Sequence, residues 1–139
     1  MSAFDFWVGD WTVTDPSDGS VGRNTIRRIL GGKVLEERFT FRGPDGKPYR
    51  GRSHTVQVDG RGWCQTWVDS NGLYLDFVGN TTENGMLLER EAVVEGVAVT
   101  QRMVWSDITP ESLVWQWMRA PTGSDDWQPL WRLHHVRNP

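Results

Sequence analysis

The feature that most constrains the fold is a series of short runs in which apolar and polar residues alternate. No stretch of ten or more residues keeps an apolar period of 3.6, which argues against long amphipathic helices. Clusters of turn-forming residues, such as Asp15–Gly19, Gly43–Gly46 and Asp59–Gly62, separate the runs. The pattern predicts nine or ten β-strands, at about 6–14, 22–30, 33–42, 49–58, 62–69, 73–79, 86–94, 97–106, 112–119 and 127–137.

The connections between these strands are short, so strands that follow one another in the sequence should pair as antiparallel hairpins. A meander this long must either close on itself or leave two exposed edges, and closure removes the risk of edge-to-edge aggregation. We therefore expect residues 1–139 to form a single all-β domain, a closed antiparallel meander barrel. The alternative is a two-sheet sandwich, whose crossing connections need longer loops.

Composition limits the classes of partner. The hydrophobic fraction is 37%, but the nine tryptophans can each bury a large area in a core. The net charge is −3 with no basic tract, and no run approaches the roughly 20 apolar residues of a membrane helix, so we expect neither a nucleic-acid nor a membrane partner. Cys64 is the only cysteine, which excludes an internal disulfide. The first residues do not resemble a signal peptide, so the expected location is cytoplasmic.

Motifs along most of the chain resemble those of a known superfamily. Gly9-x-Trp11 stands at the start of the first predicted strand, within Asp5-Phe6-Trp7-x-Gly9-x-Trp11. Ile29-Leu30-Gly31-Gly32 and Gln65-x-Trp67-Val68-Asp69-x-x-Gly72 follow in order. Together they resemble the calycin superfamily of lipocalins and fatty-acid-binding proteins, and within it a bacterial family of uncharacterised calycin-like proteins.

The resemblance implies a lipocalin-like barrel and little about its chemistry. Calycins place an arginine near the last strand, stacked on the signature tryptophan, where it caps the closed end of the barrel. Arg137 is the best match for this arginine and Arg132 the second, with Trp11 as the tryptophan. This role is structural. The chain departs from secreted lipocalins because it has no disulfide and no pattern for a C-terminal helix.

Alternation along each strand predicts which side chains face the interior. The inward faces combine indoles with a few polar groups, which is the usual make-up of a small-molecule site. Strand 49–58 is ambiguous, because His54 shares one face with Val56 and Val58 while Ser53 and Thr55 share the other; we favour the face with His54. Trp67 and Trp115 are the leading candidates for ligand contacts. The full predicted set is Phe39, His54, Trp63, Gln65, Trp67, Gln101, Met103, Trp105, Trp115 and Trp117.

Two inward titratable residues are candidates for chemistry. Glu37 could act as an acid or base with a raised pKa, or form a buried ion pair with Arg119 or Arg90. His135 could move a proton, or ligate haem as a late-strand histidine does in the calycin-like nitrobindins, or be an ordinary core residue. No other cofactor or metal site is indicated, because the histidines and carboxylates lack the spacing of metal ligands.

Four functions remain open at this point. The first is an intracellular barrel that binds a small, largely apolar or aromatic molecule. The second is a cofactor-free cyclase, isomerase or decarboxylase that uses Glu37 or His135. The third is a haem protein of nitrobindin type, and the fourth is a structural module. The sequence identifies neither the ligand nor the oligomeric state, and a homodimer is compatible with it.

Overall fold

The chain folds as a closed barrel of ten antiparallel strands. The computed structural model describes residues 3–139. After a short 3-10 helix, η1 (Asp5–Trp7), come the strands β1 (Gly9–Thr14), β2 (Val21–Ile29), β3 (Val34–Arg42), β4 (Pro48–Val58), β5 (Gly62–Asp69), β6 (Tyr74–Thr82), β7 (Gly85–Val94), β8 (Val97–Ser106), β9 (Ser112–Pro121) and β10 (Gln128–Arg137). Within the described range, no helix is long and apolar enough to cross a membrane.

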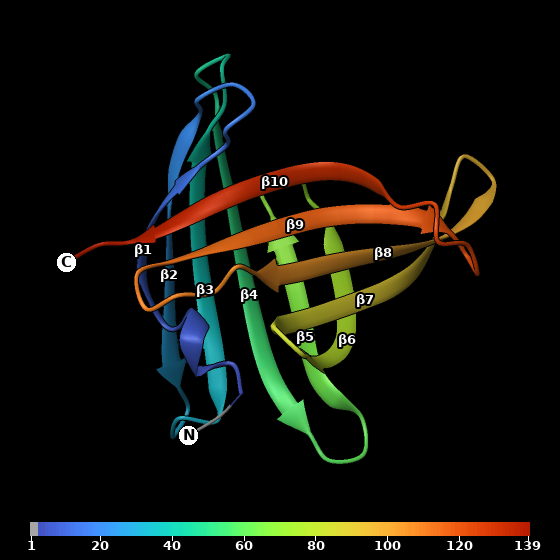
Figure 1. Cartoon of the computed structure of the whole chain (residues 1–139), viewed down its shortest axis with the longest axis horizontal. Helices are drawn as coiled ribbons and strands as arrows, with labels where there is room; N and C mark the ends of the chain where they lie inside the picture. The colour runs from blue at the N-terminus through green and yellow to red at the C-terminus, as the bar shows by residue number, and fades with distance from the viewer. Residues whose placement is uncertain (1–2) are drawn as a thin grey trace.

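Each strand pairs with its neighbours in the sequence, and β1 pairs with β10 to close the barrel. Figure 1 shows β7–β10 passing across β2–β5, so that the two groups enclose the interior from opposite sides. The closing pair runs from Trp11 opposite Arg137 to Thr14 opposite His134. The prediction of a closed antiparallel meander is confirmed, and the sandwich is excluded.

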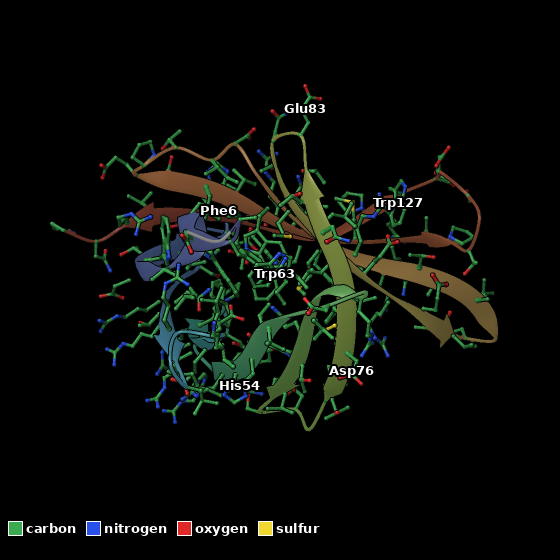
Figure 2. All side chains as sticks on the ribbon, turned by 90° about the horizontal axis from the view of Figure 1, so that it is seen from below. Phe6, His54, Trp63, Asp76, Glu83 and Trp127 are labelled. Carbon is green, nitrogen blue, oxygen red and sulfur yellow. The ribbon has the colours of Figure 1, made fainter. Side chains whose placement is uncertain are left out.

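The strand bounds agree with the predicted ranges to within two residues except at the start of the chain and at the end of β6, which was predicted to end at residue 79 and continues to Thr82. The sequence predicts a strand from residue 6, but β1 begins at Gly9 because Asp5–Trp7 form η1. Phe4 and Trp7 are fully buried, and the Phe4 ring packs edge-on against Trp63 and Trp105. This segment therefore covers the barrel end at which β5 begins and β8 ends. Figure 2, seen from that side, shows Phe6 of η1 beside the interior that holds Trp63.

Arg137 fastens this end segment to the barrel. Its guanidinium carbon lies 4.2 Å from the centre of the Trp11 ring. Its nitrogens donate to the backbone oxygens of Val8 at 2.7 Å, Phe6 at 3.2 Å and Pro110 at 2.9 Å. The predicted stacking of Arg137 on Trp11 is confirmed, whereas Arg132 is exposed and faces away from the interior. We call this end, with η1, Trp11 and Arg137, the closed end.

Candidate ligand-binding cavity

The barrel encloses a cavity of about 140 Å³. It extends from Trp7 and Trp105, which are 1% exposed, to Leu73, which is 49% exposed, so it reaches the surface beside the β5–β6 turn. We call the part of the cavity next to the closed end of the barrel the inner end, and the part near Leu73 the outer end. The lining consists of Trp7, Asn24, Glu37, Phe39, Tyr49, Trp67, Leu73, Leu75, Phe77, Met103, Trp105, Trp115, Trp117, Leu133 and His135.

At the outer end of the cavity, the carboxylate of Asp69 binds two aromatic side chains. Its carboxylate accepts hydrogen bonds from the Tyr49 hydroxyl at 2.6 Å and from the Trp67 indole nitrogen at 3.1 Å. Although burial acts against it, these bonds hold the pKa of the Asp69 carboxyl below its ordinary value. Burial and the nearby Asp69 raise the pKa of Tyr49, which therefore stays a hydroxyl. Two aromatic side chains are thus fixed at the outer end by one charged group.

Further aromatic rings pack behind the cavity wall at Trp115. Trp131 lies edge-on to Phe41 at 5.2 Å and to Trp115 at 5.9 Å between ring centres. The Trp131 indole nitrogen donates to the Asp15 carboxylate at 2.9 Å. This second indole–carboxylate bond repeats the arrangement of Trp67 on Asp69, so the ring positions are held by hydrogen bonds as well as by packing.

A polar cluster stands on the wall of the cavity. The Glu37 carboxyl accepts hydrogen bonds from Ser53 Oγ at 2.7 Å and from Asn24 Nδ2 at 2.9 Å. Asn24 Nδ2 also lies 3.4 Å from Nε2 of His135. The amide of Asn24 therefore links the carboxyl to the imidazole, and β2, β3, β4 and β10 each contribute one member of the cluster.

Burial shifts both titratable groups of this cluster toward their uncharged forms. Burial raises the pKa of Glu37, although the bonds from Ser53 and Asn24 oppose the rise. Burial lowers the pKa of His135 to about 4, with the Leu133 backbone acting in the opposite direction. A neutral imidazole and a carboxyl that tends to keep its proton can face an apolar cavity at lower cost than two charges could.

The inner end also contains indole N–H groups without partners. Nε1 of Trp7 and Nε1 of Trp105 are buried and have no hydrogen-bond partner among the described residues, and the same holds for Oδ1 of Asn24. The two indoles lie edge-on with ring centres 5.3 Å apart. Buried polar atoms are nearly always paired with protein or water, so this end of the cavity is suited to a guest with polar atoms of its own.

Most of the predicted side chains lie on the cavity. Phe39, Trp67, Met103, Trp105, Trp115 and Trp117 line it, together with Glu37 and His135. Three others face inward without lining it. Trp63 packs against Phe4, Gln65 Nε2 donates to Thr55 Oγ1 at 3.0 Å, and Gln101 accepts from Arg90 Nη1 at 2.6 Å. Contact of any of these residues with a ligand stays a prediction.

Two predictions are wrong. His54 does not face inward: its side chain is 60% exposed and lies 3.8 Å from Glu36, and Figure 2 shows it on the outside of the barrel. The buried residues of β4 are those of the other face, Gly51, Ser53 and Thr55. In the part of the chain that the structure describes, Glu37 has no ion pair with Arg119 or Arg90. Its oxygens accept from Ser53 and Asn24, and Arg90 donates to Gln101.

Seven lining residues are outside the predicted set. Four of them are apolar residues that strand alternation places on inward faces: Leu73, Leu75, Phe77 and Leu133. Sequence reasoning missed the other three, each for a physical reason. Trp7 enters the cavity from η1, where strand alternation does not apply. Tyr49 belongs to β4, whose inward face was assigned wrongly. Asn24 is a polar residue on β2, opposite Trp11 of β1, and that register could have placed it inside. No group of three or more His, Cys, Asp or Glu side chains within residues 3–139 could hold a metal ion.

Comparison with known proteins supports the fold alone. No family model matches the chain, and no curated protein matches its sequence. Among solved structures, a de novo designed fluorescence-activating β-barrel is similar with a TM-score of 0.52. The two share 15% sequence identity, and the match covers 99% of each chain. At this identity the likeness shows a shared barrel architecture.

Proposed function

We propose that this protein binds a small, largely apolar or aromatic molecule inside the barrel. The observation that supports it is the cavity of about 140 Å³, walled by aromatic and aliphatic side chains with a few polar groups among them. An engineered cavity of about 150 Å³ in another protein holds a benzene molecule, whereas drug-sized ligands need roughly 300 Å³ or more. The size therefore favours a guest with a single ring.

We also propose that the barrel is calycin-like. Support comes from Arg137, which lies on Trp11 and donates to backbone oxygens at the closed end. In this interpretation the closed end is structural, and ligands reach the cavity from the outer end beside Leu73.

The test is calorimetric titration of the purified protein with toluene, next to a variant whose cavity is filled. Leu75→Trp places an indole in the cavity and should abolish the binding heat. Val78→Trp is the matched control, since Val78 lies on the outer face of the same strand and is 37% exposed. Toluene that binds equally well to Leu75→Trp, or not at all to the unchanged protein, would contradict the proposal. Near-ultraviolet circular dichroism would show that each variant is folded.

A cofactor-free enzyme is the second candidate, supported by the link from Glu37 through Asn24 to His135 on the cavity wall. Glu37 with a raised pKa would give a proton to a bound substrate, and neutral His135 would take one. An imidazole with a pKa near 4 is a weak base, so the geometry supports binding more strongly. In an enzyme, Glu37→Gln would lower turnover strongly and leave the affinity for apolar ligands within about tenfold.

The residues around His135 do not fit a haem. His135 is 3% exposed, and its Nε2 faces the Asn24 amide at 3.4 Å. A cavity of about 140 Å³ is below the range for drug-sized ligands, and a porphyrin is larger than these. We therefore derive no haem chemistry for this protein.

A further inference from the structure

Among the residues that the structure describes, the cavity lining contains no arginine or lysine, and its only titratable side chains are Glu37, Tyr49 and His135. Burial shifts the pKa of each of them toward its uncharged form. A ligand carboxylate would therefore lose its hydration and find no positive charge on the wall. The lining thus selects against an anion such as a fatty acid.

Hydrogen bonding differs between the two ends of the cavity. At the outer end, the indole of Trp67 is bound to a carboxylate, as is that of the adjacent Trp131. At the inner end, the N–H groups of Trp7 and Trp105 have no partner among residues 3–139. Each of these side chains is 1% exposed, so bulk water does not satisfy them.

An acceptor without a partner in the described chain accompanies these donors. Oδ1 of Asn24 is buried and unpaired, while its Nδ2 is committed to Glu37. Asn24, Trp7 and Trp105 line the same cavity, and Trp11 connects them. Trp11 lies opposite Asn24 in the β1–β2 pair, and its Nε1 donates to the Trp7 backbone oxygen at 2.9 Å. A hydroxyl is the smallest uncharged group that can donate to such an acceptor and accept from an indole N–H.

We propose that the cavity takes an uncharged single-ring aromatic compound bearing a hydroxyl group, with that group at the inner end between Asn24 and the Trp7–Trp105 pair. This inference rests on the proposed binding function and names its ligand class. The ring fills the apolar part of the cavity against Phe39, Trp115 and Leu133. The hydroxyl donates to Oδ1 of Asn24 and accepts from an indole N–H.

The test compares three probes of similar size by isothermal titration calorimetry at neutral pH: phenol, toluene and benzoate. Phenol should bind roughly tenfold or more tightly than toluene, because toluene leaves the buried polar atoms unpaired. Benzoate, which is charged at this pH, should show no measurable binding.

Each contrary result has a distinct meaning. Toluene binding as tightly as phenol would overturn the hydroxyl assignment and leave the proposed function intact, since ordered water would then satisfy the polar atoms. Benzoate binding as tightly as phenol would overturn the selection against anions. Failure of all three probes to bind would overturn the proposed function together with this inference.

A pair of variants tests the assigned position. Trp105→Phe keeps a ring in the cavity and removes one N–H, so the ratio of phenol to toluene affinity should fall several-fold. Trp127→Phe is the matched control, because Trp127 lies outside the cavity with Arg102 3.7 Å above its ring, and its ratio should stay unchanged. Asn24→Leu should lower the ratio as well, which gives a second measurement if Trp105→Phe folds poorly. An unchanged ratio in both lining variants would overturn the assignment.

Discussion

Glu37 is a titratable residue of the cavity wall whose burial should make protein stability depend on pH. Its carboxyl is buried and its pKa is raised above the ordinary value of 4.5. Above that pH the unfolded chain releases the proton, while the folded protein keeps it until the pH passes the raised pKa. Protein stability should therefore fall as the pH rises through this interval. Glu37→Gln removes the titration, so its free energy of unfolding, measured in urea from pH 4.5 upward, should fall less than that of the unchanged protein.

Glu36→Gln is the control for this prediction. Glu36 lies next in the chain but faces outward, where it accepts a hydrogen bond from Arg38 at 3.1 Å. Its variant leaves Glu37 buried and should therefore keep the fall in stability that burial of Glu37 causes. Parallel curves for the Glu37→Gln variant and the unchanged protein would show that Glu37 ionises in the folded state as it does in the unfolded chain.

Gly51 determines where the indole of Trp67 can lie. A Cβ at this position would overlap the six-membered ring of Trp67, and the indole is held on its other side by Asp69. Gly51→Ala should lower stability by about 1–3 kcal/mol and change the tryptophan fluorescence spectrum, because the ring must move. Gly43→Ala, whose Cβ would meet only Asp45 at an ordinary 3.6 Å, should change neither. An unaltered spectrum and melting temperature for Gly51→Ala would contradict the packing described here.

Alternation in the sequence correctly predicted the inward-facing side chains of strands that have a clear apolar face. Leu35, Phe39 and Phe41 on β3 placed Glu37 inside correctly. On β4 the apolar face was misleading. Val56 and Val58 face outward, while small residues, Gly51 and Ser53, face the interior, since the large indole of Trp67 and the carboxyl of Glu37 occupy the space in front of them. The space available to a side chain depends on the side chains of the neighbouring strands. The alternation within one strand does not contain that information.

The pairing of β1 with β10 closes the barrel. Only Trp11–Thr14 of β1 pair with β10, and Trp11 is fully buried beneath Arg137. Trp11→Ala should therefore lower the free energy of unfolding by about 3–5 kcal/mol. Thr12→Ala, on the same strand with an exposed side chain, should cost far less. Chemical denaturation measures both, and an unchanged midpoint for Trp11→Ala would mean that this tryptophan does not hold the closed end together.

The elements themselves were largely predictable, because turn residues mark the strand ends. β5 and β8 have the bounds that the sequence indicates, 62–69 and 97–106. Besides the end of β6, the main exception is η1, which contains the aromatic residues of a strand but folds back into the barrel end, where Phe4 stacks on Trp7 at 4.9 Å. Local alternation cannot distinguish a strand from a plug that is buried through long-range contacts.

At the scale of the whole molecule, His135 makes stability sensitive to acid. The folded protein keeps this imidazole neutral down to a pKa of about 4, whereas in the unfolded chain it binds a proton near 6.5. Acidification from pH 6.5 to 4 therefore favours the unfolded state, by about 3 kcal/mol from this group. His135→Gln should lose correspondingly less stability over this range in urea titrations. A His135→Gln curve parallel to that of the unchanged protein would refute the effect.

The closure of the barrel has a consequence for the order of the chain. Asn138 lies beside β1, since its backbone nitrogen donates to the Asp10 oxygen at 2.8 Å. Because every strand also lies next to its neighbours in the sequence, the connectivity is that of a ring cut between β10 and β1. A circularly permuted chain, with a linker joining the original ends and new ends at the exposed Glu95–Gly96 turn, would keep every strand pairing. The residues that line the cavity lie in one stretch before this turn and one stretch after it, so the new ends would interrupt neither stretch.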